Sequence, residues 1–301
     1  MKAELKEAAT KGPLVWLDMD QQEIDDAYDQ AVWAPNREHV ATRRRLASER
    51  TIARIGPAER VAYGPTEIEQ LDIYKTRRAN APIMIFIHGG AWKSGAAKDS
   101  TYMAEMYLAA GANFVIPDFV SVENAGGSLM TMADQVRRAV AWVYKNAASF
   151  GGDPNRLYLS GHSSGGHLGG CVVVTDWQKD FGLPPDILKG ALLVSGMYDL
   201  KPVRLSKRSS YVKFDDGTEQ ALSALRHLDK IHTPLIIAHG SLESPEFQRQ
   251  SREFAAAVKA AGKPVEFFVG EGFNHFDMQE TMGNPFGLGG RAALEMMKLK
   301  L

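Results

Sequence analysis

Cysteine is almost absent from this sequence, since Cys171 is the only one among 301 residues. A single cysteine excludes an internal disulfide and any metal site built from several thiolates. Because Cys171 stands between Gly170 and Val172 in an apolar stretch, we expect a buried structural thiol there. The charged stretch 1–11 has neither the apolar core segment of a signal peptide nor the features of a transit peptide. We therefore expect a cytoplasmic protein.

An excess of charge is also missing. The 35 lysine and arginine residues balance 36 aspartate and glutamate residues, and the formal net charge is −1. Such a chain has no electrostatic reason to bind nucleic acid or an anionic membrane surface, and no apolar run approaches the length that spans a bilayer. Neither a P-loop pattern nor His-Glu-x-x-His occurs. We expect no metal, no organic cofactor and a small molecule as partner, while a homo-oligomer stays open.

The length and composition suit one large α/β domain or two small ones. No internal repeat or low-complexity linker divides the chain, so we predict a single domain over residues 1–301. Residues 1–57 are charged and helix-prone, which predicts an N-terminal helical extension. The run Arg43 to Arg45 within it is more typical of a solvated helix face than of a basic patch for a partner.

From residue 82 onward, apolar runs alternate with helix-like stretches. The run 83–87 is apolar throughout, as expected for a strand buried on both faces. This alternation predicts an α/β fold with a mostly parallel central sheet and helices on both faces. The stretches 60–63 and 70–74 are expected to pair antiparallel at one edge of the sheet. Residues 197–230 interrupt the alternation, either as a solvated loop or as a short cap that shapes a pocket.

The stretch from Leu157 to Gly170 carries the strongest chemical signal. A strand-like run leads into Gly161-His162-Ser163-Ser164-Gly165, and small and apolar residues follow that can continue as a helix. Gly-x-Ser-x-Gly between a strand and a helix is typical of a turn that exposes a nucleophilic serine. This turn requires a strained backbone at Ser163, and the two glycines allow strand and helix to approach closely. Ser163 is the predicted nucleophile.

A nucleophilic serine needs a base later in the chain and an acid between the two. Of the eight histidines, only His275 lies beyond the last expected strand, in a glycine-flanked loop, and it is the predicted general base. The acid is expected after the apolar run 234–238, where Glu243 stands in the loop. Glu246 falls inside the next helix and suits a capping role. Asp199 is the reserve candidate for the acid.

Donors for an oxyanion are expected from the loop after the run 83–87, which reads His88-Gly89-Gly90-Ala91-Trp92. Adjacent glycines leave backbone N–H groups unobstructed. The predicted donors are the backbone N–H groups of Gly89, Gly90 and Ser164. Four large apolar residues in the expected loops could bind substrate, although each would also suit the core: Trp92, Met197, Tyr198 and Phe273.

Together these stretches resemble the α/β-hydrolase superfamily. The sequence is similar to the branch that shares the His-Gly-Gly motif with hormone-sensitive-lipase-like esterases, and within it to the kynurenine formamidase (arylformamidase) group. The resemblance covers most of the chain and is carried by residues 25–29, 88–92, 134–142, 161–168, 195–200 and 244–251. It departs from the family pattern at 117–124, where Asn/Asp-Tyr-Arg-Leu-Ala-Pro is common, and at Glu243, where aspartate is usual.

The resemblance implies the α/β-hydrolase fold and hydrolysis of a small amide or ester through an acyl-enzyme. In this reading Ser163 attacks a carbonyl, His275 takes its proton and Glu243 orients the imidazole. Two functions share this machinery, an arylformamidase-like amidase and a carboxylesterase for small acyl esters. A third alternative is a non-catalytic binding protein on the same fold, although such proteins typically lack one of the three residues.

Overall fold

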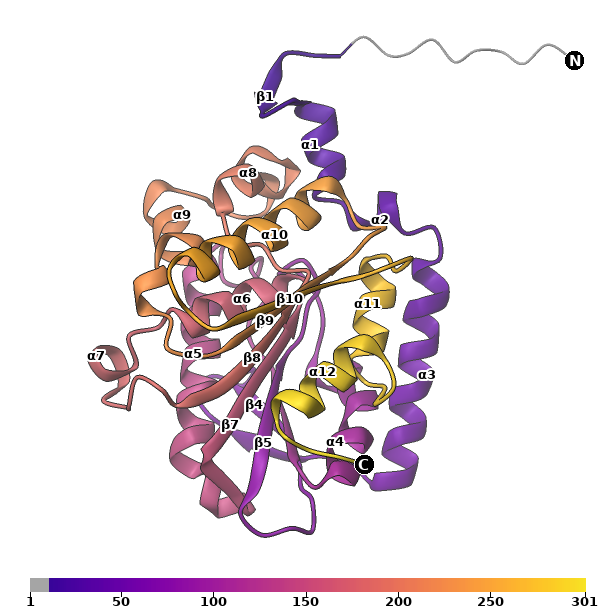
Figure 1. Ribbon diagram of the computed structural model, residues 1–301, viewed down its shortest axis with the longest axis vertical. Coiled ribbons are helices and arrows are strands. Elements are labelled where there is room, and N and C mark those ends of the chain that lie inside the picture. The colour runs from indigo at the N-terminus through magenta and orange to yellow at the C-terminus, as the bar shows by residue number, and fades with distance from the viewer. Residues whose placement is uncertain (1–10) are drawn as a thin grey trace, which may run out of the picture.

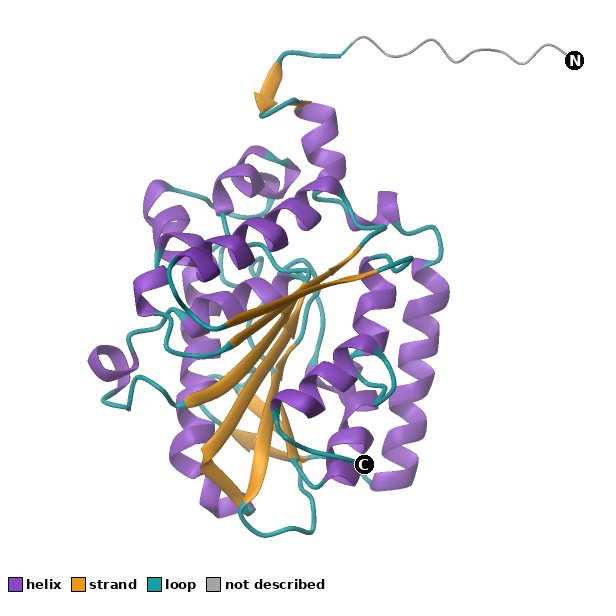
Figure 2. Ribbon diagram, in the orientation of Figure 1, coloured by secondary structure: helices purple, strands orange, loops and turns teal. Residues whose placement is uncertain are grey.

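The computed structural model describes residues 11–301, so residues 1–10, the start of the predicted extension, lie outside the described part. A central eight-stranded sheet lies between two layers of helices (Figure 2), and a separate two-stranded sheet precedes it. The strands are β1 (Leu14–Trp16), β2 (Met19–Asp20), β3 (Glu59–Ala62), β4 (Gln70–Tyr74), β5 (Ala81–Ile87), β6 (Asn113–Pro117), β7 (Gly152–His162), β8 (Leu188–Val194), β9 (Leu235–Gly240) and β10 (Val265–Gly270).

The strand order across the central sheet is β10-β9-β8-β7-β5-β6-β4-β3. Neighbouring strands from β10 to β6 pair in parallel. β4 pairs antiparallel with both β6 and β3, so β3 forms one edge of the sheet. The predicted α/β fold with a mostly parallel sheet is therefore confirmed, as is the antiparallel pair at its edge.

Helices cover both faces of this sheet (Figure 1). Within residues 11–301 no helix has both the length and the apolar character to cross a membrane. The α-helices are α1 (Gln21–Ala27), α2 (Gln30–Trp33), α3 (Arg37–Ile55), α4 (Ala104–Ala110), α5 (Leu129–Asn146), α6 (Ser164–Val173), α7 (Trp177–Phe181), α8 (Leu200–Leu205), α9 (Asp216–Leu222), α10 (Pro245–Ala260), α11 (His275–Thr281) and α12 (Leu288–Met296).

Strand β5 shows how the helices pack against the two faces of the sheet. Successive side chains of a strand point to opposite faces. Ile83, Ile85 and Ile87 accordingly pack in the core under α5, α6 and α10, whereas Met84 and Phe86 pack in the core under α4, α11 and α12. All five are fully buried, which explains why the run is apolar at every position. Cys171 in α6 lies in the core under α5, α6 and α10, and burial raises the pKa of its thiol to about 11.

Helix α3 packs along the outside of α11 and of the 3₁₀ helix 97–103. Arg43 pairs with Glu280 at 2.7 Å, and Arg44 hydrogen-bonds Gln279. The arginine run therefore partly docks on α11, the helix that begins at His275. These contacts place the N-terminal extension against the element that carries the predicted base.

The segment 197–230 is built from α8, α9 and short 3₁₀ turns. It contacts the N-terminal residues before α3: Gln21 donates to the Leu205 carbonyl, and the Lys207 ammonium lies 2.7 Å from the Asp29 carboxylate. The two segments lie beside each other at one end of the molecule (Figure 1). This is the end at which the parallel strands finish.

Candidate active site

The predicted nucleophile follows β7 directly and precedes α6. Ser163 has φ 60° and ψ −127°, so the strained backbone expected from the sequence is confirmed. A Cβ at Gly161 would lie 2.4 Å from the Gly165 carbonyl oxygen, and one at Gly165 would lie 2.1 Å from that of Ile87. Only glycine permits these approaches. The strand–turn–helix therefore forces Ser163 to the carboxyl edge of the sheet.

Three side chains from separate strand ends form one hydrogen-bonded line. Ser163 follows β7, Glu243 follows β9, and His275 follows β10. The distance from Ser163 Oγ to His275 Nε2 is 2.8 Å, and that from His275 Nδ1 to Glu243 Oε2 is also 2.8 Å. The exposed fractions are 7% for Ser163, 3% for His275 and 1% for Glu243. A serine, an imidazole and a carboxylate so arranged can generate a nucleophile.

The Glu243 carboxylate accepts two further hydrogen bonds on its other oxygen. Ser195 Oγ donates to Oε1 at 2.6 Å, and the Gly240 backbone N–H donates at 2.7 Å. The other two acids named from the sequence lie elsewhere in the hydrogen-bond network. Asp199 caps α8 and pairs with Arg226 at 3.3 Å. Glu246 pairs with Arg249, so neither of them takes the place of Glu243 beside His275.

His162 packs against His275 and hydrogen-bonds to its backbone. Its ring lies 4.5 Å from the His275 ring, and its Nε2 lies 2.8 Å from the His275 carbonyl oxygen. Burial lowers the pKa of His162 well below its ordinary value, so the ring is neutral at pH 7 and Nε2–H donates this bond. The ring of Phe247 contacts His275 edge-on at 5.0 Å. These contacts set the orientation of the imidazole.

The predicted oxyanion donors lie close to the nucleophile. A Cβ on Gly89 would lie 3.1 Å from the Ser163 Cβ, which shows how closely this loop approaches. Within the described chain, no residue accepts a hydrogen bond from the backbone N–H of Gly89 or Gly90. Ser164 is the first residue of α6, where N–H groups have no partner within the helix. These groups are therefore available to a developing negative charge.

Two cavities meet at Ser163 and His275, which line both of them. The smaller site cavity, about 310 Å³, lies on the side of α3. The larger site cavity, about 470 Å³, lies between residues 28–31 and 207–211. The smaller site cavity is also lined by Arg44, Arg45, His88, Gly89, Gly90, Asp99, His162 and Gln279. The larger site cavity is also lined by Tyr28, Asp29, Ala91, Lys93, Lys207, Arg208, Tyr211 and Phe276.

None of the four apolar residues considered as substrate-binding walls lines either site cavity. Met197 and Tyr198 are fully buried in the core, where Tyr198 stacks on Phe254 at 4.2 Å. Trp92 is buried and its indole N–H donates to His167 Nδ1. Phe273 packs on the core under α11 and α12. The structure therefore places them as packing residues, because their side chains contact the core and not the site cavities.

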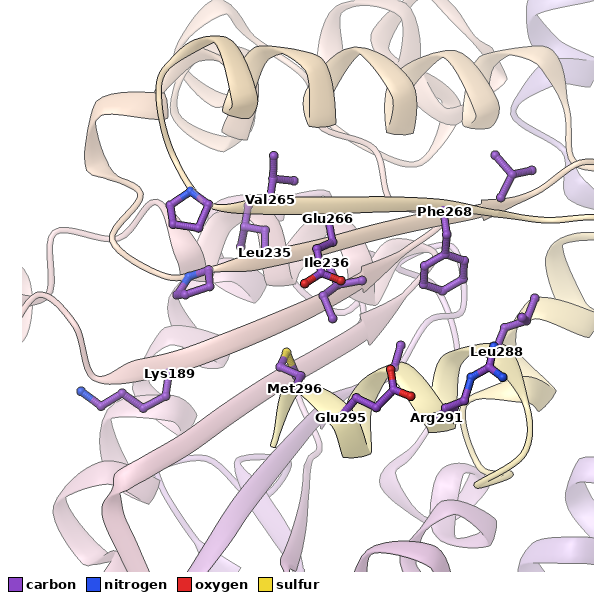
Figure 3. A pocket seen from close by; sticks show the side chains of 14 residues that line it. Lys189, Leu235, Ile236, Val265, Glu266, Phe268, Leu288, Arg291, Glu295 and Met296 are labelled. Atoms are coloured by element: carbon purple, nitrogen blue, oxygen red, sulfur yellow. The ribbon is translucent and has the colours of Figure 1, made fainter. Parts of the chain in front are cut away.

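A further cavity lies away from Ser163. It measures about 750 Å³ and lies between α12 and the beginnings of β9 and β10 (Figure 3). Its walls combine apolar side chains such as Ile236 and Phe268 with Glu266, Arg291 and Glu295. It shares no residue with the two site cavities.

Within residues 11–301, no three His, Cys, Asp or Glu side chains gather closely enough to hold a metal ion.

Several residues of the site carry no motif of their own. Ser195 is recognisable only as part of the stretch 195–200 that carries the family resemblance. Arg208 lies in a basic segment that looks like any solvated surface. Tyr28 lies some 135 residues before the nucleophile, and like Ser195 it is recognisable only within a stretch, 25–29, that carries the family resemblance. No local pattern indicates that Tyr28 and Arg208 reach the same cavity, because the tertiary fold alone brings them together.

Known proteins are similar to this chain in sequence and in fold. The family model BD-FAE matches residues 71–185. Kynurenine formamidase of Danio rerio is 30% identical over 89% of this chain and 93% of its own length. That of Salmo salar is 29% identical, with the same coverage of both chains. The carboxylesterase EstE1, cloned from a metagenomic library, superposes with a TM-score of 0.69 at 17% identity over 88% of this chain and 95% of its own.

Proposed function

Because the chain belongs to the kynurenine formamidase family of α/β-hydrolases, we propose that it is a serine hydrolase that cleaves a small aryl formamide. The observation that carries this proposal is the line of two 2.8 Å hydrogen bonds from Glu243 through His275 to Ser163. The two site cavities support it, because they leave room for the two halves of a substrate on either side of the nucleophile.

In the first half of the reaction, Ser163 Oγ attacks the formamide carbon while His275 Nε2 takes the hydroxyl proton. Glu243 accepts the Nδ1–H bond and stabilises the imidazolium. The N–H groups of Gly89, Gly90 and Ser164 donate to the oxyanion of the tetrahedral intermediate. His275 then gives its proton to the amine nitrogen, the C–N bond breaks, and the arylamine leaves with the formyl group remaining on Ser163.

In the second half, water replaces the amine. His275 removes a proton from this water, which attacks the formyl ester of Ser163. When the second tetrahedral intermediate collapses, His275 returns the proton to Ser163 Oγ and formate leaves. The sum is one amide bond hydrolysed by one water molecule, with the serine, histidine and glutamate restored.

The test is turnover of an N-formyl arylamine and of a short-chain aryl ester by the wild type and by Ser163→Ala. We expect kcat/KM for the formamide to equal or exceed that for the ester. Because single triad deletions typically remove most of the rate, Ser163→Ala should lower kcat at least about a thousandfold. The matched control is Ser149→Ala, an exposed serine at the other end of the sheet, which should keep the wild-type rate. Full activity in Ser163→Ala would refute the proposed nucleophile.

One observation favours a second candidate, a carboxylesterase for small acyl esters. The smaller site cavity of about 310 Å³ exceeds what a formyl group fills. With the aryl group in the larger site cavity, an acetyl or butyryl group would have room in the smaller one. Cleavage of acetyl and butyryl aryl esters without cleavage of the formamide would establish this alternative.

A further inference from the structure

The loop that carries two of the predicted oxyanion donors has a strained backbone directly after them. Ala91 and Trp92 have φ 53° and 64°, in the left-handed region that residues other than glycine rarely adopt. Such a conformation is unfavourable by itself and persists only where surrounding contacts hold it. The contacts that hold residues 91 and 92 therefore also determine where the N–H groups of Gly89 and Gly90 point.

The first turn of α6 supplies two of these contacts. The backbone N–H of Trp92 donates to Ser164 Oγ at 3.2 Å, and the Trp92 indole N–H donates to His167 Nδ1 at 3.2 Å. Ser164 and His167 are three positions apart, so their side chains lie on the same face of the helix. Trp92 and Ser164 are each only 2% exposed, so water has little access to the bond between them.

Ser164 is thus joined to the oxyanion site twice. Its backbone N–H is one of the three predicted donors, and its Oγ holds the loop that supplies the other two. On the far side of this loop, the Trp92 carbonyl accepts from the Val122 N–H at 2.8 Å. Among residues 11–301, however, only Ser164 Oγ accepts from the Trp92 backbone N–H. A single hydroxyl therefore links the two halves of the oxyanion site.

We propose that the Ser164 hydroxyl is a positioning group, which holds the loop of Gly89 and Gly90 at the distance from Ser163 that the oxyanion requires. This inference rests on the proposed serine hydrolysis but not on the choice between formamide and ester, because both form the same kind of oxyanion. The oxyanion exists in the transition state and not in the bound substrate. Loss of the hydroxyl therefore lowers kcat and leaves KM nearly unchanged.

The first variant is Ser164→Ala, which keeps the backbone N–H and removes only Oγ. Loss of a whole oxyanion donor costs about a hundred- to a thousandfold in rate, and displaced donors keep part of their effect. On whichever of the aryl formamide and the aryl ester the wild type cleaves, we therefore expect kcat to fall about ten- to a hundredfold. KM should stay within about twofold.

The matched control is Ser94→Ala, which removes a serine hydroxyl from the same loop. Ser94 Oγ donates to the Gly90 carbonyl at 3.3 Å, but the Ser94 backbone N–H already donates to that carbonyl at 3.1 Å. The hydroxyl is thus redundant, and kcat should stay within about twofold of the wild type. An equal loss of kcat in both variants would overturn the proposal.

A tetrahedral inhibitor separates positioning from general damage to the site. In an aryl trifluoromethyl ketone, Ser163 Oγ bonds to the carbonyl carbon, the serine proton passes to His275, and the carbonyl oxygen becomes an anion in the oxyanion site. The Ki of this ketone should rise in Ser164→Ala by about the factor by which kcat falls. The Ki of the arylamine product, which forms no oxyanion, should not change. Equal weakening of both inhibitors, or an unchanged kcat, would overturn the proposal.

A second variant, Ser164→Cys, separates the hydrogen bond from the side-chain volume. The thiol occupies the space of the hydroxyl, but sulfur is a weak acceptor, so kcat should stay about three- to tenfold below that of the wild type. Wild-type kcat in Ser164→Cys would overturn the proposal, because volume alone would then be enough. Circular dichroism checks that each variant is folded, and Ser164→Cys decides the question if Ser164→Ala does not fold.

The positioning role and the proposed function can fail separately. Full turnover by both the wild type and Ser164→Ala would refute the positioning role and leave the function intact. Calorimetric binding of the trifluoromethyl ketone covers the case in which the wild type cleaves neither substrate. Tight binding that Ser164→Ala weakens would then support the positioning role and refute the function. A wild type that neither cleaves a substrate nor binds the ketone would refute both.

Discussion

At the scale of single residues, the backbone of Ser163 is the most constrained point of the site. A non-glycine residue with φ 60° and ψ −127° costs about 1–3 kcal/mol. The surrounding structure maintains this conformation, because the Ser163 N–H donates to the Val194 carbonyl at 3.0 Å and the following residues enter α6. The strain is thus confined to one residue, and it exposes Oγ to both site cavities.

Glu243 is the residue whose role the sequence left divided with Asp199. Glu243→Gln keeps the side-chain shape but removes the charge that stabilises the imidazolium, so kcat should fall by about a thousandfold or more. Asp199→Asn is the matched control. Its carboxylate accepts from the Lys201 backbone N–H and pairs with Arg226 instead of contacting His275, so kcat should stay within about twofold. Steady-state kinetics on the aryl formamide measures both. A larger loss in Asp199→Asn than in Glu243→Gln would reverse the assignment.

Single residues could be predicted where chemistry restricts the choice. Ser163 lies in a five-residue motif, His275 is the only histidine after the last strand, and Gly89 lies in a glycine pair after a buried strand. The pocket could not be predicted in this way. Whether an aromatic such as Tyr198 lines a cavity or fills the core depends on contacts with Phe254, 56 positions later, and both environments select the same residue type.

At the scale of elements, the segment from β1 to α2 is tied to the N-terminal turn of α10. Tyr28 donates its hydroxyl to Glu246 Oε2 at 2.8 Å and accepts from Gln250 Nε2 at 2.7 Å. Burial and the Glu246 carboxylate raise the pKa of Tyr28 well above its ordinary value, so the hydroxyl remains a donor. Ser244 also donates to the Ala27 carbonyl. This buried network positions residues 28–31 as a wall of the larger site cavity.

Tyr28→Phe tests that attachment. Removing the hydroxyl takes one of its donors from Glu246, which keeps Arg249, and one acceptor from Gln250 Nε2, which keeps the Asp199 carbonyl, so two buried hydrogen bonds are lost, one of them to a carboxylate. The free energy of unfolding should therefore fall by about 1–3 kcal/mol. Urea denaturation measures the change, and Tyr144→Phe is the control, since Tyr144 is half-buried and its hydroxyl has no hydrogen-bond partner among the described residues. An equal loss in both variants would mean that the network contributes nothing beyond packing.

The helices and strands themselves can be predicted from the spacing of apolar residues and from their place in the chain. The helix-like stretches that alternate with the apolar runs include α5 and α10, and both are helices in the structure. The charged first part of the chain is helical in α1 to α3, but the prediction of a helical extension was wrong for residues 14–20, which form the strands β1 and β2. Its docking on α10 and α11 could not be predicted, because hydrogen bonds such as Tyr28–Glu246 join residues more than two hundred positions apart.

At the scale of the whole molecule, four buried histidines link stability to pH. Burial lowers the pKa of His88, His162, His167 and His239, that of His167 to about 3. These rings bind protons less readily in the folded protein than in the unfolded chain, where they take up protons below about pH 6.5. The unfolded state therefore binds more protons, and stability falls as the pH falls from about 6.5 toward the folded-state pKa values.

The free energy of unfolding, measured in urea between pH 7.5 and 5, should thus be level above about pH 7 and decline below it. Each histidine adds a slope that approaches about 1.4 kcal/mol per pH unit. His167→Gln removes one such group and should flatten the decline by up to that amount. His232→Gln, an exposed histidine, is the control and should not change the slope. A constant stability between pH 7 and pH 5 would contradict this reading.

The close packing of Gly161 and Gly165 in the turn around Ser163 has a consequence for inheritance. Every amino-acid change that a single nucleotide can make in a glycine codon introduces a Cβ, and neither Gly161 nor Gly165 has space for one. No substitution at these two positions can therefore be neutral. Most residues that face the larger site cavity come from 28–31 and 207–211, outside the central sheet, where a substitution leaves the turn at Ser163 unchanged. A lineage can exchange its substrates by altering these outer segments while the turn that carries the serine is inherited unchanged.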